Sequence, residues 1–272
     1  MEKEMIKIYK NGDEFYNDNR EFLLTNKYTE AFYRFDAPLL LEVNDKEYAL
    51  KAHDEKHTLL VLKKEPFNLL LFGDKELIGE LFNFIFENKY EVKDYLCPTE
   101  LGDEIALFLN KHGYDSHLQL GMDFMEAKER CDVCSNEVEA ATEDDVNEIY
   151  ECTCQFAKDC GLTDKIDIDK IIAKIHDFRI IRKDGKIVSM AKAHIWTDLD
   201  KKISYVFTRQ EYRGQGYARK VVGTVLNEII DSGYIATLNV DQKNPISNRL
   251  YASLGFKKIF SQGVYALGEN IK

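Results

Sequence analysis

Ten residues at positions 211–220, EYRGQGYARK, combine two glycines with three basic residues directly before a strongly apolar helical pattern. Free N–H groups at the start of a helix, together with the helix dipole, bind anions. Glycines let the backbone approach a phosphate closely. The segment alone therefore leaves two interpretations open, a phosphate-binding turn that leads into a helix or a surface loop that its glycines shape.

The elements around this turn form a crossover. A strand is predicted at 201–208, and after the turn apolar residues recur at the spacing of one helix face until Gly233. A buried strand at 235–240 follows, and Asn244 and Pro245 form the cap and first residue of a short helix. A strand, a turn, a helix and a strand in this order place the two strands in parallel. The apolar positions of the long helix are Ala218, Val221, Val222, Val225, Leu226, Ile229 and Ile230.

The rest of the second half is also a mixed α/β pattern. Thr142 followed by Asp145 resembles a capping box at the start of a helix, and Asp184-Gly185 is a turn signal inside a hairpin. A further helix is indicated by four isoleucines between them, and the chain closes on a strand region at 256–267. The isoleucines are Ile168, Ile171, Ile172 and Ile175.

The first half has a parallel order: helical segments, short strands, a helix, a strand, a helix and a strand, without a glycine turn of this kind. A polar stretch at 129–137 is interpreted as a linker. The chain is therefore predicted to be α/β (α+β) with two domains, residues 1–134 and 135–272. The predicted segments are 14–25, 29–41, 46–54, 57–64, 67–73, 74–90, 91–97, 98–113 and 114–124.

The glycine turn lacks the Lys-Ser/Thr ending of a P-loop and the third glycine of a dinucleotide fold. It matches R-x-x-G-x-A at Arg213, Gly216 and Ala218, and N-P-x-S-N-x-x-Y-x-x-x-G-F follows at 244–256. Together these motifs resemble the acyl-CoA pyrophosphate loop and the following elements of the GCN5-related N-acetyltransferase (GNAT) superfamily, closest to its FR47-like branch. The resemblance covers about residues 138–267 and implies a GNAT acyl-CoA transferase fold in the C-terminal half, preceded by a degenerate GNAT-like half.

The resemblance also implies how acetyl-CoA is held. Backbone amides of residues 214–219 hold its pyrophosphate, and backbone groups of residues 206–208 pair with its pantetheine arm, one of them polarising the thioester carbonyl. The cofactor-binding residues implied in this way are Val206, Phe207, Thr208, Arg213, Gly214, Gln215, Gly216, Tyr217, Ala218, Arg219, Asn244, Ser247 and Tyr251.

Two residues are candidates for catalysis. An amine that attacks a thioester must be neutral, and the departing thiolate needs a donor. Tyr251 matches the family's general acid, although a tyrosine packed in a helix is the alternative; Asn244 has a sufficient role as a helix cap. Many relatives carry a base on the strand equivalent to 201–208, where this chain has no carboxylate, so His194 on the preceding strand is the substitute candidate. An ordinary strand histidine and a bound water remain alternatives.

The composition limits the partners. A formal net charge of −11 opposes general binding to nucleic acids and to anionic membranes. The first residues lack the apolar core of a signal peptide, and no apolar stretch is long enough to span a membrane. Six cysteines dispersed through 272 residues suit a reducing compartment. A cytoplasmic protein is expected.

Two cysteine pairs, CDVC at 131–134 and CTC at 152–154, have spacings that call for a test of zinc binding. Cys152 and Cys154 lie in a predicted helix, where side chains two positions apart point about 200° apart. Because two ligands that face opposite ways cannot share one zinc ion, no metal is expected.

The function implied is an N-acetyltransferase that moves acetyl from acetyl-CoA directly to a primary amine of a small molecule or a peptide. Two alternatives stay open: a CoA-binding sensor or interaction protein without transferase activity, and an amino-acid N-acyltransferase that uses longer acyl-CoA. The acceptor site is expected to involve the loop at 159–165 and the final strand region. A homodimer is compatible with the sequence.

Overall fold

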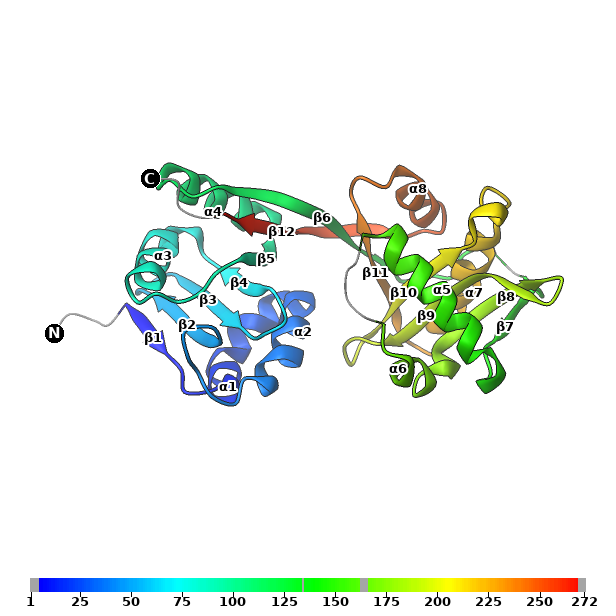
Figure 1. Cartoon of the computed structure of the whole chain (residues 1–272), viewed down its shortest axis with the longest axis horizontal. Helices are drawn as coiled ribbons and strands as arrows, with labels where there is room; N and C mark the ends of the chain where they lie inside the picture. The colour runs from blue at the N-terminus through cyan, green and yellow to red at the C-terminus, as the bar shows by residue number, and fades with distance from the viewer. Residues whose placement is uncertain (1–4, 134, 162–165, 269–272) are drawn as a thin grey trace. The chain divides into compact units, whose positions relative to one another are not determined.

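The computed structural model describes residues 5–133, 135–161 and 166–268. The chain divides into two compact units (Figure 1). Unit 1 runs to Asp123 and includes the chain again from Phe260, and unit 2 is Phe124–Ile259. Both units are mixed α/β structures, as the sequence predicts.

In the described residues, unit 1 contains five complete strands, four helices, the first part of a sixth strand and, from Phe260 on, most of the last strand of the chain. Short 3₁₀ turns at Leu24–Asn26, Ala37–Leu39 and Lys75–Leu77 join some of them. The elements are β1 (Ile6–Ile8), α1 (Gly12–Leu23), α2 (Lys27–Asp36), β2 (Tyr48–His53), β3 (Thr58–Lys63), β4 (Leu69–Gly73), α3 (Ile78–Glu87), β5 (Asp94–Pro98), α4 (Thr99–Lys111) and β6 (Ser116–Ala127).

Unit 2 follows with the same order of elements. Its 3₁₀ turns are Glu143–Asp145, Ile175–Asp177 and Gln210–Tyr212. The elements are β7 (Val138–Ala140), α5 (Val146–Asp159), α6 (Ile168–Ile172), β8 (Phe178–Lys183), β9 (Lys186–Ile195), β10 (Asp200–Thr208), α7 (Tyr217–Asp231), β11 (Ile235–Asp241), α8 (Pro245–Ser253) and β12 (Lys257–Leu267), and β12 belongs to unit 1 from Phe260 on.

Strand pairing repeats along with the element order. In unit 1, β2, β3 and β4 pair antiparallel and β4 pairs parallel with β5. In unit 2, β8, β9 and β10 pair antiparallel and β10 pairs parallel with β11. The parallel pair across the glycine turn is therefore confirmed. Two copies of one topology stand in tandem, which agrees with the parallel order of elements in the sequence.

The division of the chain into units differs from the predicted one, because the last strand of each copy lies partly in the other unit. Residues Gln262–Ala266 of β12 pair antiparallel with Asp94–Pro98 of β5, so the end of the chain belongs to unit 1. In the strand order β6, not β12, is the neighbour of β11. The packing thus divides the chain at Asp123 and Ile259, whereas the sequence placed one division between 134 and 135. Pairing between segments more than 160 residues apart leaves no local signal.

Each face of the unit 2 strands is covered by its own helices. The first core lies between the strands and α7, whose buried Val221, Val222 and Leu226 meet Ile203 and Leu238. Burying each such side chain contributes about 1.5–3 kcal/mol. The second core lies on the α5 and α6 side and contains Ile149, Cys152, Ile171, Ile180, Met190 and Phe207. The strands of unit 2 therefore form the middle of three layers.

Local sequence signals agree with the structure at most elements. Thr142 and Asp145 form a capping box, with the Thr142 N–H 2.8 Å from the Asp145 carboxylate. Asp184 and Gly185 have φ of 50° and 78°, as a tight hairpin turn requires. The short strands β1 and β7 were missed, and α6 ends at Ile172, earlier than the isoleucine spacing indicated.

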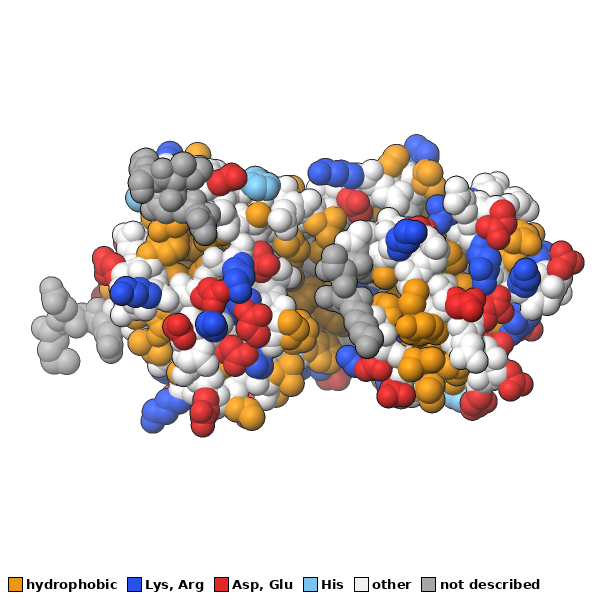
Figure 2. Space-filling view, in the orientation of Figure 1, with side chains coloured by type: hydrophobic (Ala, Val, Ile, Leu, Met, Phe, Trp, Pro, Cys, Tyr) orange, Lys and Arg blue, Asp and Glu red, His pale blue; other side chains and the backbone are white. Residues whose placement is uncertain are grey.

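Charges of both signs are interspersed on the face drawn in Figure 2, over both units, without a broad basic patch. In the part of the chain that the structure describes, no helix has the length and apolar character needed to cross a membrane.

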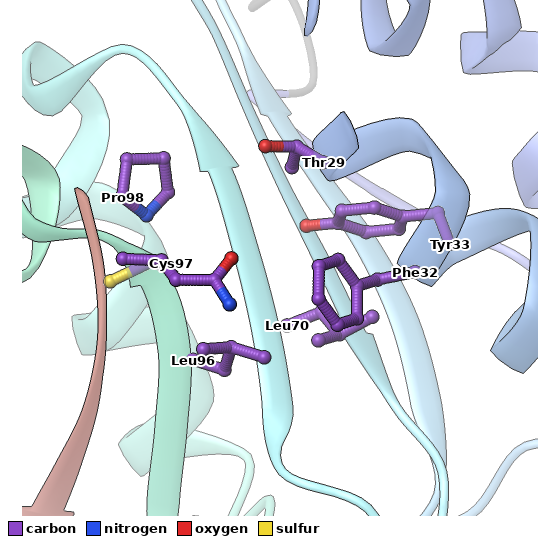
Figure 3. Close-up of a pocket in the computed structure, with 8 residues that line it drawn as sticks. Thr29, Phe32, Tyr33, Leu70, Leu96, Cys97 and Pro98 are labelled. Carbon is purple, nitrogen blue, oxygen red and sulfur yellow. The ribbon is translucent and has the colours of Figure 1, made fainter. Parts of the chain in front are cut away.

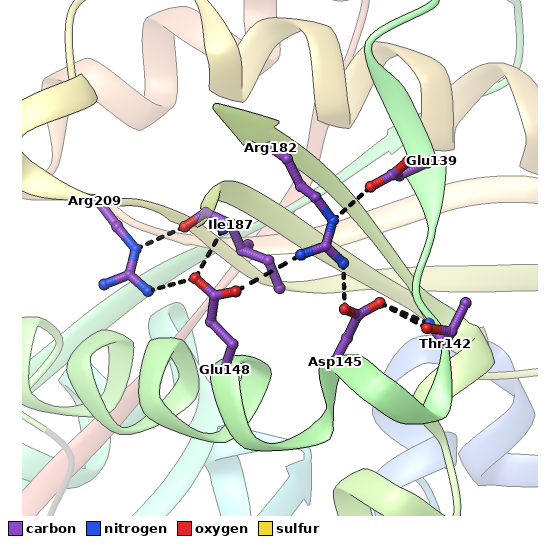
Figure 4. Close-up of polar contacts among 7 residues, drawn as sticks. All are labelled: Glu139, Thr142, Asp145, Glu148, Arg182, Ile187 and Arg209. Carbon is purple, nitrogen blue, oxygen red and sulfur yellow. Dashed lines mark hydrogen bonds and ion pairs between the residues drawn. The ribbon is translucent and has the colours of Figure 1, made fainter. Parts of the chain in front are cut away.

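A polar network ties α5 to the strands and to the segment that follows β10 (Figure 4). The Glu148 carboxylate accepts hydrogen bonds from the Ile187 N–H at 2.8 Å and from Arg209 at 3.0 Å. Arg182 forms ion pairs with Glu148, Asp145 and Glu139. Since Arg209 stands directly before the glycine turn, Glu148 fixes the start of that turn relative to α5.

Replacing Glu148 by alanine should destabilise unit 2. The change leaves the half-buried Arg209 and the Ile187 N–H without their acceptor, which should cost about 1–3 kcal/mol. Denaturant unfolding followed by the fluorescence of Trp196, the single tryptophan, reports on this unit. The control is Glu151→Ala, an exposed position on the same helix. Equal losses in the two variants would contradict the role of the network.

Candidate functional site

The glycine turn forms an open anion cradle at the start of α7. Gly214 and Gly216 have φ of 75° and 84°, and a Cβ added at either would meet no atom within 4 Å. Gly216 is the N-cap of this 15-residue helix, no side chain caps its first turn, and that turn carries no acidic residue. The first N–H groups of α7 therefore have no acceptor within the helix and lie at the positive end of its dipole.

The side chain of Arg213 anchors this turn. Its Nε donates to the Thr208 carbonyl at 3.0 Å, and its guanidinium pairs with Asp159 at the end of α5. The turn is thus attached to both β10 and α5. Arg213 was predicted to bind cofactor, and its observed contacts give it a clear role in shaping the turn from which the backbone amides point.

Two further basic side chains beside the turn are already paired. Arg219 contacts Asp132 at 2.9 Å and the Ser253 hydroxyl at 3.1 Å. Lys220 pairs with Glu137. The backbone of the turn, and not these side chains, therefore provides the uncompensated positive potential.

Strand β10 separates from β11 before it reaches the turn. The two strands pair only over Asp200–Lys202 with Ile235–Thr237. A bulge follows between Ser204 and Phe207, where Tyr205 has a φ of 49°. After the bulge Phe207 and Thr208 pair with β9 on one side. In the described strands, their other edge has no β11 partner, so an extended ligand could hydrogen-bond there as an added strand.

The predicted pantetheine-binding residues Val206, Phe207 and Thr208 thus lie on a free strand edge that leads to the glycine turn. The bulge itself was not predicted, because a tyrosine rarely adopts a positive φ. Such strained backbone is typical of functional sites.

The equivalent place in unit 1 is filled. Gly73 ends β4, and a Cβ there would lie 2.1 Å from the Thr58 carbonyl oxygen, so this turn packs against β3. Beside β4 and β5 lies a cavity of about 10 Å³, lined by Phe32, Tyr33 and Leu96 among others (Figure 3). Such a space holds about one water molecule. Unit 1 therefore lacks the open cradle of unit 2.

Tyr251 lies on α8 and is 7% exposed, packed with its ring edge toward Phe256. Burial raises the pKa of its hydroxyl well above the usual value, with a smaller contribution from Cys160. Tyr251 is therefore protonated at neutral pH, and its hydroxyl can donate a proton or a hydrogen bond. This state suits the predicted acid, and the packing agrees with the structural alternative as well.

Asn244 caps α8, since its side-chain oxygen accepts the Ser247 N–H at 3.0 Å. The capping interpretation is confirmed, while contact with a cofactor stays a prediction. Ser247 lies in the first turn of the same helix and is half-buried.

His194 lies on β9 directly opposite Lys202 on β10, with its ring 6.3 Å from that of Trp196. Burial, with smaller contributions from Lys192, Lys202 and Lys174, lowers the pKa of His194 to about 4. The imidazole is thus neutral at pH 7 but weakly basic. Alternate residues of a strand point to the same side of a sheet. The patterns K-x-H at 192–194 and K-x-S at 202–204 were therefore a sequence signal for a shared polar face.

A carboxylate does begin β10, contrary to the strand predicted at 201–208. Asp200 is fully buried, and its carboxylate accepts hydrogen bonds from Thr197 and from Thr237. It stabilises the strand start, remote along β10 from the bulge.

The second cysteine pair lies on α5. Cys152 is buried in the core beneath α5, and Cys154 is only partly buried on the same helix. Cys134 of the first pair and residues 162–165 of the predicted acceptor loop lie outside the described residues. In the described ranges no three His, Cys, Asp or Glu side chains group as metal ligands would.

The mixed α/β fold of unit 2 thus places the open N-terminus of α7 beside two parallel strands that separate. Such a site can hold an extended, phosphorylated ligand. Residues 143–256 match the model of the acetyltransferase (GNAT) family. The match falls in the C-terminal half, where the sequence motifs resemble the same family.

Relatives and solved structures agree with this fold. Uncharacterised N-acetyltransferases of Mycobacterium bovis and Mycobacterium tuberculosis are 36% identical over 77 residues, 28% of this chain and 49% of theirs. The chain thus spans about half the length of these curated relatives. A GCN5-related N-acetyltransferase from Sphaerobacter thermophilus superposes with a TM-score of 0.68 at 13% identity, over 97% of this chain and 95% of its own. A GNAT-family acetyltransferase from Colwellia psychrerythraea gives 0.63 at 14%, over 97% and 99%.

The depressed pKa of His194 predicts how stability depends on pH. The folded state disfavours its protonation, so the free energy of unfolding should fall as the pH drops from 6.5 toward 4 and be unaffected above 6.5. His194→Gln should reduce this fall, as measured by urea midpoints at each pH. The exposed His176→Gln is the control. An imidazole that titrates near pH 6.5 by NMR would contradict the burial argument.

Proposed function

We propose that this protein is an N-acetyltransferase that transfers the acetyl group of acetyl-CoA to a primary amine. The observation that carries the proposal is the open glycine cradle at the start of α7, next to the free edge of β10. The GNAT match over residues 143–256 and the names of the relatives support it. We also assign the chain to the FR47-like branch, from its motifs, and place it in the cytoplasm.

The residues present fit acetyl-CoA. The amides of residues 214–219 would hold its pyrophosphate, because two glycines at positive φ leave room for phosphate oxygens. Val206, Phe207 and Thr208 would hydrogen-bond its pantetheine arm along the free edge of β10. Bound there, acetyl-CoA supplies an activated acyl thioester. Unit 1, whose equivalent turn is packed closed, is assigned no cofactor of its own.

Tyr251 would donate to the leaving sulfur. It lies in the core formed by α7, α8 and the strands, and its high pKa keeps it protonated. A preorganised donor of this kind commonly contributes about 3–4 kcal/mol to the transition state. The acceptor amine must also lose a proton, and His194 is the predicted base.

Gly216→Val should abolish acetyl-CoA binding. Its side chain would occupy the open space of the cradle and strain a residue with a φ of 84°. The measurement is the rise in melting temperature that excess acetyl-CoA causes in the unmodified protein. The matched control is Gly233→Val at the other end of α7, also at positive φ with open space around it. This control should lose comparable stability but keep the shift. A full shift in Gly216→Val would refute the cradle.

Tyr251→Phe should keep the acetyl-CoA shift and lower kcat by about 10²-fold, because the ring still packs while the donor is lost. Thiol release from acetyl-CoA across a panel of amines measures turnover. Unchanged turnover would leave Tyr251 a purely structural role. A protein that binds acetyl-CoA yet acylates no amine would favour the CoA-binding sensor, and preference for longer acyl-CoA would favour the amino-acid N-acyltransferase.

A further inference from the structure

Four polar side chains share one face of β9 and β10. Lys202 is the direct partner of His194 in the antiparallel register, and Ser204 is the direct partner of Lys192. Directly paired residues point to the same side of a sheet, as do residues two apart along a strand. We call Lys192, His194, Lys202 and Ser204 the cationic cluster.

Aromatic rings surround the two lysines of this cluster. The Lys192 ammonium lies 5.5 Å from the ring centre of Phe178 and 5.7 Å from that of Tyr205, the residue of the bulge. The Lys202 ammonium lies 4.1 Å from the ring of Trp196. The rings exclude water around the lysines and hold their stems in place.

Charges of both signs lie around the cluster. Burial lowers the pKa of Lys192, Asp177 raises it and Lys174 lowers it. Burial lowers the pKa of Lys202 to about 8, which Asp200 opposes. The carboxylate of Asp200 also accepts hydrogen bonds from Thr197 and Thr237. The two lysines thus place positive charge on one face of β9 and β10 in a chain whose net charge is −11.

Two polar atoms of the cluster have unused hydrogen-bonding capacity. Within the described residues, neither His194 Nδ1 nor Ser204 Oγ, both buried, has a partner. Buried polar groups are nearly always satisfied by protein, water or ligand. Neutral His194 and the Ser204 hydroxyl can each donate to an anion that the lysines attract.

We propose that Lys192 and Lys202 bind an anionic group carried by the acceptor amine, so that the substrate is an amino acid or an aminoalkyl phosphate. The proposal rests on the proposed transferase function. It specifies the acceptor class, which the glycine turn and Tyr251 leave undetermined.

The position of the cluster on β10 fits this assignment. Ser204 and Val206 are two residues apart, about 7 Å at the rise of a strand, with the bulge between them. An acceptor bound by its anion at the cluster would therefore need only a short carbon chain to bring its amine to the thioester.

The first experiment uses the full chain, acetyl-CoA and matched acceptor pairs. 4-Aminobutyrate is compared with butylamine and 1,4-diaminobutane, and phosphoethanolamine with ethanolamine. We expect kcat/KM at least about tenfold higher for the anionic members, as one charge-assisted hydrogen bond provides. The two anionic compounds separate a carboxylate from a phosphate acceptor. Equal or better use of the neutral or dicationic amines would overturn the proposal.

Substitutions then locate the anion. Lys192→Met and Lys202→Met should raise KM for the anionic acceptor about 10- to 100-fold, with little change for butylamine. Lys192→Arg should restore most of the loss. The control is Lys201→Met on the opposite face of β10, where the ammonium lies 4.7 Å from the Tyr234 ring centre. An intact acetyl-CoA shift shows that each variant is folded, and the partly buried Lys192 carries the test if Lys202→Met does not fold.

The outcomes separate the two proposals. If acetyl-CoA does not bind the unmodified protein, the transferase assignment fails. If it binds and the acceptor pairs show no preference for the anion, or the lysine variants leave KM unchanged, only the acceptor class fails. If it binds and no amine in the panel is acetylated, both the transferase and its acceptor class are overturned.

Discussion

The separation of β10 from β11 is the constraint on which the site depends. Parallel pairing stops after Lys202, and the bulge at Tyr205 turns the following residues away from their former partner. If β10 and β11 stayed paired, the edge of residues 206–208 would be hydrogen-bonded to β11 and could not take up a ligand as an added strand. A positive φ at a tyrosine is costly by about 1–3 kcal/mol. The aromatic contacts of Tyr205 with Phe156 and Phe178 help to hold it there.

The comparison of the two units shows how little is needed to lose such a site. Both have the order strand, two helices, three strands, helix, strand, helix, strand, and both have a parallel pair in the same place. In unit 1 the turn after β4 packs directly on Thr58 and leads into a 3₁₀ turn without a glycine-capped helix. The topology is retained, yet the open space and free amides that bind phosphate are missing. What differs is the turn, not the fold.

The sequence could predict what depends on near neighbours. Thr142 with Asp145, Asp184-Gly185 and Asn244-Pro245 each specify a local geometry that the structure has. The positions of β12 beside β5 and of β6 beside β11 could not be predicted, because the energy that favours them comes from pairing between strands far apart in the sequence. The bulge could not be predicted either, since a tyrosine such as Tyr205 rarely adopts a positive φ. The ion pairs of Arg219 with Asp132 and of Lys220 with Glu137 were also not predicted, because these partners lie more than 80 residues away along the chain.

The same electrostatics bear on how an acceptor amine could become neutral. For an ammonium with a pKa near 10.4, deprotonation at pH 7 costs about 4.6 kcal/mol, at about 1.36 kcal/mol per pKa unit. His194, with a pKa of about 4, is a weak base for this step. However, burial, the larger cause, and the charges of Lys192, Lys202 and Lys174 lower the pKa of His194, and these charges act in the same sense on an amine near the cationic cluster. If the acceptor's anion lies between Lys192 and Lys202, the remaining field of Lys174 and the lysines favours the neutral amine. A weaker general base would then suffice. This would account for Lys202 and Ser204 on β10, the strand on which the family resemblance led us to expect a carboxylate.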